Sequence, residues 1–141
     1  MEEKAPTYLL DASALYPLLK ILGHALYGHL GRFLVLDLTK YEIGNAVWVE
    51  ARRGLIRDWR RAFRAWAVVL RNLGEAAVED FVEAGEIAGS MDITFYDSSY
   101  ILAAKKKNLT LVTEDKEMAK KANQLGVKVI GVKAVSYTHL T

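Results

Sequence analysis

Four carboxylates that follow short apolar runs are the residues of this chain best suited to catalysis. They are Asp11, Glu42, Asp97 and Asp115. In a parallel sheet, residues just beyond the strand ends meet at one edge. Four like charges in a small space repel one another and raise each other's pKa unless a counter-ion is present. A hard divalent cation with oxygen ligands is the simplest counter-ion, so the pattern predicts a Mg²⁺ or Mn²⁺ site.

Each of these acids also has an ordinary structural interpretation. Asp11 and Asp115 come directly before predicted helices and fit the N-cap position, and Asp97 lies in a predicted first turn. Glu42 fits the third position of a capping box that begins at Thr39, and on local grounds the cap is the better interpretation for it. The argument for a site therefore depends on all four acids reaching the same sheet edge.

Two hydroxyl side chains accompany the acids. Ser13 and Thr113 lie two residues after Asp11 and two residues before Asp115, where their hydroxyls could hold a water at a metal. Ser13 could also cap the helix that follows Asp11, which would free that carboxylate to face the cation.

Other polar residues compete with this set or extend it. Asp37 ends its own predicted strand and competes with Glu42 for the acidic position, while Asn45 follows Glu42 on the same helix face. Asp92 and Glu114 are expected to face solvent. No His or Cys residue forms an alternative constellation, because the chain has no Cys and only three His.

A group of arginines is the second chemical feature of the chain. They surround the junction between two predicted helices: Arg52, Arg53, Arg57, Arg60, Arg61 and Arg64. The last four share a helical face that could follow a phosphate backbone. The alternative is a solvated face opposite an aromatic stripe of Trp59, Phe63 and Trp66. The net charge of +2 does not by itself indicate a nucleic-acid partner.

Strand-like runs alternate with helical patterns along the chain. We expect strands at 8–11, 33–38, 76–79, 109–113 and 127–132, with helices at 13–22, 41–53, 57–73, 80–90, 96–107 and 116–125. A glycine-broken stretch from Gly23 to Gly31 separates the first helix from the second strand. The order predicts an α/β fold, a three-layer α/β/α sandwich around a central parallel sheet of four or five strands.

The composition fits one domain. With 141 residues and 52% hydrophobic residues, the chain can build its own core, which we expect to span residues 1–135. Residues 136–141 read as a disordered tail of the kind that an expression vector leaves, so His139 is a poor catalytic candidate. The absence of cysteine and of any apolar run near 18 residues leads us to expect a cytoplasmic protein without a membrane span.

The acidic motifs, taken together, resemble those of the PIN domain, and in particular of the VapC-type ribonuclease toxins of prokaryotes. The resemblance rests on the segments Tyr8–Leu15, Tyr41–Ala46, Thr94–Ala103 and Leu111–Asp115. It extends over nearly the whole chain, to about Val135. The third segment is the most specific, whereas the extra acid Glu114 and the glycine-rich stretch depart from the family pattern.

The resemblance implies a PIN-like three-layer fold and a single-strand-specific endoribonuclease that depends on Mg²⁺ or Mn²⁺. It implies metal ligation by Asp11, Glu42, Asp97 and Asp115, with Ser13 and Thr113 as supporting polar groups. It also implies a homodimer and, for a toxin of a toxin-antitoxin pair, a cognate antitoxin protein that blocks the site.

Two other functions remain as alternatives. A non-catalytic RNA-binding or scaffold version of the same fold is the first, and the intact acids argue against it. A receiver-type phosphoacceptor domain is the second, since it also places Asp residues at the ends of parallel strands. That class needs adjacent acids after its first strand, where this chain offers Asp11 alone.

Overall fold

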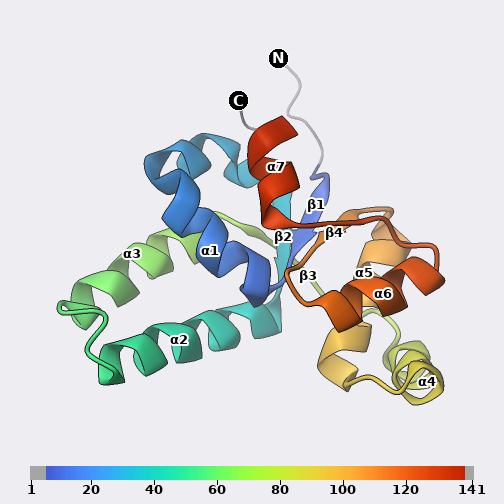
Figure 1. Ribbon diagram of the computed structural model, residues 1–141. Helices are drawn as coiled ribbons and strands as arrows, with labels where there is room; N and C mark the ends of the chain where they lie inside the picture. Colours follow the sequence, from blue (N-terminus) through green and yellow to red (C-terminus); the bar gives the residue numbers. More distant parts are fainter. Residues whose placement is uncertain (1–5, 139–141) are drawn as a thin grey trace.

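The computed structural model describes residues 6–138 as alternating strands and helices (Figure 1). The strands are β1 (Tyr8–Leu10), β2 (Phe33–Leu36), β3 (Gly74–Ala76), β4 (Thr110–Val112) and β5 (Val129–Ile130). The helices are α1 (Ala12–Leu22), the 3₁₀ helix η1 (Gly23–Arg32), α2 (Asp37–Arg52), α3 (Trp59–Arg71), α4 (Phe81–Met91), α5 (Phe95–Lys107), α6 (Lys116–Gln124) and α7 (Val132–Thr138).

All five strands run parallel in one sheet, in the order β3-β2-β1-β4-β5. The central strand β1 places Leu9 opposite Leu34 of β2 and opposite Leu111 of β4. Because the strands share one direction, the residues that follow β1, β2 and β4 lie at the same edge of the sheet. The predicted parallel sheet is confirmed.

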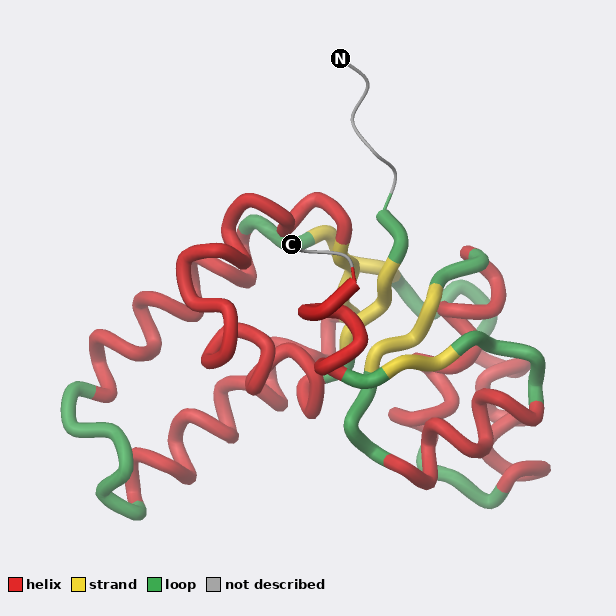
Figure 2. Tube along the Cα trace, turned by 45° about the horizontal axis from the view of Figure 1, so that its top comes forward, coloured by secondary structure: helices red, strands yellow, loops and turns green. Residues whose placement is uncertain are grey.

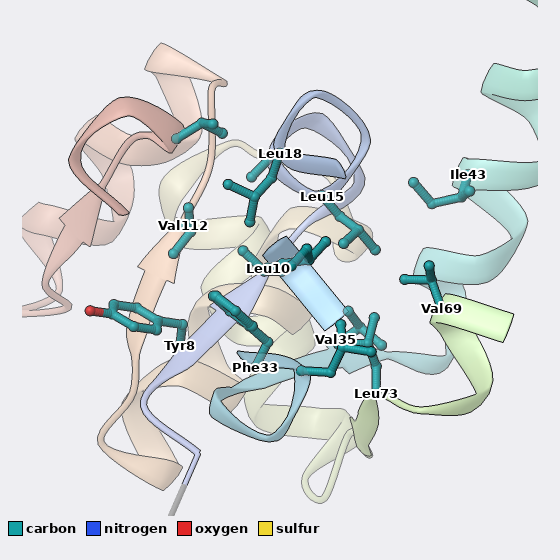
Figure 3. Close-up of a cluster of buried hydrophobic side chains, with 14 of the residues drawn as sticks. Tyr8, Leu10, Leu15, Leu18, Phe33, Val35, Ile43, Val69, Leu73 and Val112 are labelled. Atoms are coloured by element: carbon teal, nitrogen blue, oxygen red, sulfur yellow. The ribbon is translucent and has the colours of Figure 1, made fainter. Parts of the chain in front are cut away.

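Helices cover both faces of the sheet, which gives the predicted α/β/α layers (Figures 1 and 2). Alternate residues of β1 point to opposite faces: Tyr8 and Leu10 join the core beneath α1, α2, α3 and α7, whereas Leu9 joins the core beneath α5 and α6. Figure 3 shows the first of these cores, with Leu15 and Leu18 of α1 packed on the sheet. Two dry cores hold the strand ends in place.

The second helix begins earlier than the sequence predicts. We expected a strand to Leu38 and a helix from Tyr41, but β2 ends at Leu36 and α2 begins at Asp37. The backbone N–H of Leu36 donates to the Thr39 hydroxyl, 3.1 Å away, so Thr39 satisfies the helix start from within the first turn. The predicted capping box of Thr39 and Glu42 is therefore wrong.

Two helical segments were missing from the prediction. The stretch Gly23–Arg32 forms η1, whose Leu26 and Leu30 are buried. The second is α7, which buries Val132 and Val135. It begins at the last residue of the strand predicted at 127–132 and includes the first residues of the predicted tail. The helix α7 continues past the boundary expected at Ser136 to Thr138, and His139 lies outside the described residues. Within the part of the chain that is described, no helix is long and apolar enough to span a membrane.

Candidate active site

Asp11 follows β1 directly and is 6% exposed at the carboxyl edge of the sheet. It is the N-cap of α1, because its Oδ1 accepts from the backbone N–H of Ala14 at 3.0 Å. Its two carboxylate oxygens also accept from the hydroxyls of Ser13 (2.8 Å, on Oδ1) and Thr113 (on Oδ2). The predicted cap role of Ser13 is wrong: Ser13 orients Asp11 and does not replace it.

The hydroxyls of Ser13 and Thr113 join the first turn of α1 to the loop after β4. Their oxygens are 3.2 Å apart. The Ser13 hydroxyl accepts from the backbone N–H of Glu114 at 3.0 Å, and the Thr113 hydroxyl accepts from the backbone N–H of Asp115 at 3.0 Å. This network fixes the Asp11 carboxylate relative to the loop that carries Asp115.

Glu42 reaches the same edge from the second turn of α2. Its Oε1 accepts from the Tyr100 hydroxyl at 2.8 Å, and the oxygens of Tyr100 and Thr39 are 2.6 Å apart. Tyr100 and Thr39 are both buried, whereas the Glu42 side chain is exposed. The structure therefore removes the cap interpretation for Glu42 and links this acid to α5 instead.

Asp97 and Asp115 complete the set. Asp97 lies in the first turn of α5, where its backbone N–H donates to the Thr94 hydroxyl at 3.1 Å. Asp115 comes three residues after the end of β4 and is the N-cap of α6, with Oδ1 accepting from the backbone N–H of Met118 at 3.1 Å. Asp115 caps α6 as expected, whereas α5 is capped by Thr94 and the partly exposed Asp97 carboxylate lies in its first turn as expected.

Electrostatic effects show that the four carboxylates influence one another. Burial raises the pKa of Asp11, which the hydroxyls of Thr113 and Ser13 lower in part and the charge of Asp115 raises further. Partial burial of the carboxyl groups likewise raises the pKa of Glu42 and of Asp97. The charges of Asp11 and Asp97 raise the pKa of Glu42 further. The charges of Asp115 and Asp11 do the same for the pKa of Asp97. No Lys or Arg is among the causes of these shifts.

The donor set fits a hard divalent cation in chemistry and in charge. Carboxylate and hydroxyl oxygens are the preferred ligands of Mg²⁺ and Mn²⁺, and the repulsion within the set would be relieved by a cation. Among residues 6–138, however, no three acidic or histidine side chains converge closely enough to form a ready-made metal site. The Asp11 carboxylate is held by hydroxyls and by a helix start, so binding would require side-chain rearrangement.

A groove opens beside Glu42, lined by Leu38, Tyr41, Asn45 and Tyr96. Its walls come from α2 and α5 only. Asn45, expected on the same helix face as Glu42, also lines this groove. The aromatic rings of Tyr41 and Tyr96 are 66% and 63% exposed, so they offer flat surfaces next to the carboxylates.

The neighbouring acids have other roles. Asp37 forms an exposed ion pair with Lys40, 2.5 Å away. Asp92 is the exposed C-cap of α4 in a left-handed conformation. Glu114 is exposed but accepts from the backbone N–H of Val132 at 2.9 Å, at the start of α7, a contact that the sequence did not predict.

Tyr100 is the site residue that sequence reasoning missed. Its spacing of three from Asp97 on a helix was a signal, because residues three apart share a helix face. Its partner Glu42 fits a helix cap in the sequence, and this local pattern conceals its role as the acceptor for a buried tyrosine hydroxyl.

Comparison with known proteins identifies the family. The model of the PIN domain matches residues 8–124. The chain belongs to the PIN domain family. It is of the VapC type: it is 40% identical over 114 residues to "Exonuclease VapC9" of Pyrobaculum aerophilum, covering 81% of this chain and 84% of that protein. It is also 32% identical over 89 residues to "Ribonuclease VapC3" of the same organism, covering 61% and 68%.

Solved structures agree with this assignment. A crystal structure from Pyrobaculum aerophilum matches with a TM-score of 0.81 and 37% identity, over 94% of this chain and 95% of that one. A DNA-bound VapBC structure from Salmonella typhimurium matches with a TM-score of 0.65 over 90% and 98%, and at 13% identity it shows the shared fold alone. The PIN-like fold and the VapC type, both expected from the motifs, are confirmed.

Proposed function

We propose that this PIN domain is a divalent-metal-dependent endoribonuclease that cleaves single-stranded RNA. The observation that carries the proposal is the set of four carboxylates at one sheet edge, where burial and, to a lesser extent, mutual repulsion raise the pKa of Asp11, Glu42 and Asp97. The names of the VapC relatives, an exonuclease and a ribonuclease, support phosphodiester cleavage.

In this proposal Asp11, Glu42, Asp97 and Asp115 hold Mg²⁺ or Mn²⁺. Such a cation, when bound, supplies a water of lowered pKa and offsets charge at the phosphate. Ser13 and Thr113 keep the Asp11 carboxylate oriented, and Tyr100 keeps Glu42 directed towards the other acids. Positioning of this kind typically changes affinity or activity by about 10- to 100-fold.

The groove beside Glu42 supports cleavage within a strand. The groove is open to solvent, so a strand can lie across it without threading an end. The exposed rings of Tyr41 and Tyr96 suit stacking with unpaired bases. A circular single-stranded RNA, which has no ends, should be cleaved, while an exonuclease would leave it intact.

A role as the toxin of a toxin-antitoxin pair follows from the VapC type. The proposed partners are a cognate antitoxin protein, which would block the carboxylates, and a second copy of this chain. A neighbouring reading frame for a VapB-like protein, whose product suppresses RNA cleavage by this chain, would support the first partner.

The deciding assay compares Asp97→Asn with Asp92→Asn on a single-stranded RNA in Mg²⁺ and in EDTA. Asp92→Asn is the matched control, because it removes an acid outside the carboxylate set and Asn suits its left-handed conformation. We expect the wild type and Asp92→Asn to cleave in Mg²⁺ only, and Asp97→Asn to lose at least about 100-fold while remaining folded. Equal cleavage by Asp97→Asn would refute the assignment, and RNA binding without cleavage by the wild type would indicate a non-catalytic domain.

A further inference from the structure

Arginine is concentrated in one hairpin of this molecule. Seven of the chain's eight arginines lie on α2, α3 or the loop between them: Arg52, Arg53, Arg57, Arg60, Arg61, Arg64 and Arg71. We call this segment, residues 48–71, the arginine hairpin. Its only acids are Glu50 and Asp58, so it carries an excess of five positive charges in a chain whose net charge is +2.

The positive charges of the arginine hairpin are available to a ligand. All seven arginines are exposed. Glu50 pairs with Lys20 at 2.7 Å, and Asp58 accepts from the backbone N–H of Arg61 as the N-cap of α3. Within residues 6–138 every side-chain ion pair uses a lysine. No carboxylate of the described chain therefore neutralises these guanidinium groups.

Aromatic packing makes the hairpin a defined surface. Trp48 of α2 packs edge-on against Trp59 of α3, with 5.7 Å between the ring centroids. Trp59 packs edge-on against Phe63 in the same way, with 6.3 Å between the centroids. The guanidinium of Arg60 lies over the Trp59 ring at 4.1 Å, which restricts its motion. Arg64 follows Arg60 by four residues and shares its face of α3. Trp48 remains 44% exposed beside these charges.

One face of α2 connects the arginines with the carboxylates. This face is formed by residues spaced three or four apart, which lie above one another on a helix. They are all exposed: Glu42, Asn45, Val49 and Arg53. At 1.5 Å per residue, Glu42 and Arg53 are about 16 Å apart along the helix axis. Figures 1 and 2 show the hairpin extending away from the sheet, with the loop at its far end. A strand held at the carboxylates can reach the arginines after several nucleotides.

We propose that the arginine hairpin binds the phosphate backbone of single-stranded RNA several nucleotides from the bond that is cleaved. The inference rests on the proposed ribonuclease function. Arginine, rather than lysine, suits this ligand because its planar fork pairs with phosphate oxygens and stacks on bases. The exposed Trp48 offers a stacking surface for an unpaired base on the same hairpin.

The test measures RNA affinity in an Asp97→Asn background, so that bound RNA is not degraded. Three variants of it are compared with a labelled 20-nucleotide single-stranded RNA at several salt concentrations. The first carries Arg53→Gln, Arg60→Gln and Arg64→Gln, and the second carries Lys at the same positions. The third, a matched control, removes three exposed charges elsewhere through Lys105→Gln, Lys120→Gln and Lys128→Gln.

We expect the arginine-to-glutamine variant to bind the RNA about 10- to 100-fold more weakly. The slope of log affinity against log salt concentration should be smaller by about 2, because each of the three lost phosphate contacts removes about 0.7 from it. The lysine variant, which keeps the charge, should retain the slope. The control should lose less than about threefold. With Asp97 restored, cleavage of a dinucleotide, which is too short to reach the hairpin, should stay within about twofold of wild type.

Equal losses in the glutamine variant and the control, or an unchanged salt slope, would overturn the inference while leaving the nuclease proposal intact. Unchanged RNA affinity combined with lost binding of poly-glutamate would assign the hairpin to an acidic protein instead. Failure of the unsubstituted chain to bind or cleave any RNA would refute both proposals together.

Discussion

Tyr100 illustrates how a single buried side chain organises the candidate site. Its hydroxyl lies between the Thr39 hydroxyl and the Glu42 carboxylate, at 2.6 and 2.8 Å. Burial and the Glu42 charge raise the pKa of Tyr100, so the phenol stays protonated and donates to the carboxylate. Tyr100 thus acts as a positioning residue for Glu42.

Replacing Tyr100 with Phe should reduce RNA cleavage by about 10-fold and stability by about 1 kcal/mol, because Glu42 loses its donor and Thr39 a partner. The matched control is Tyr16→Phe, which also removes a tyrosine hydrogen bond to a carboxylate, that of Glu50, outside the site. Urea unfolding and single-turnover cleavage separate the two effects. A similar loss of cleavage in both variants would assign Tyr100 a purely structural role.

At the scale of helices and strands, the sequence predicts where the acidic residues lie but not what each of them contacts. The apolar runs before Asp11 and Asp115 predicted the strand ends, because a buried strand reads directly from its hydrophobic residues. The start of α2 was misplaced, since Thr39 satisfies the Leu36 N–H from inside the helix and mimics a cap in sequence. The contact between Glu42 and Tyr100 joins residues 58 apart and leaves no local signal.

Asp115 combines a helix cap with a site carboxylate, and two substitutions separate these roles. Asp115→Asn keeps a good N-cap for α6 and should leave stability nearly unchanged, whereas Asp115→Ala should cost about 1 kcal/mol. Both remove the charge, so both should reduce Mg²⁺-dependent cleavage to the same extent. Thermal unfolding and cleavage rates check the prediction. Full activity in Asp115→Asn would restrict this residue to the cap role.

At the scale of the whole molecule, the carboxylate set makes stability depend on pH. The pKa values of Asp11, Glu42 and Asp97 are raised in the folded state, so folding favours their protonated forms. Their contribution to stability is fully present below the unfolded pKa values and is lost as the pH rises through the folded ones. The ionised carboxylates therefore lower the free energy of unfolding at neutral pH, and a bound cation would offset this loss.

Asp97→Asn should therefore be more stable than the wild type at pH 7 in EDTA, by about 1 kcal/mol. The difference should shrink as the pH falls towards 4, where the wild-type Asp97 becomes protonated. Mg²⁺ should narrow the difference at pH 7 because it stabilises the wild type more than the weaker-binding variant. Urea midpoints between pH 4 and 7 provide the measurement, and a difference that grows on acidification would contradict the assigned repulsion.

The central claim is that these four carboxylates form a divalent-cation site, and calorimetric titration with Mn²⁺ at pH 7 tests it most directly. The account predicts that the wild type and Asp92→Asn bind Mn²⁺, and that Asp97→Asn binds at least about 10-fold more weakly. Equal Mn²⁺ binding by the wild type and Asp97→Asn, or no binding by the wild type, would contradict it.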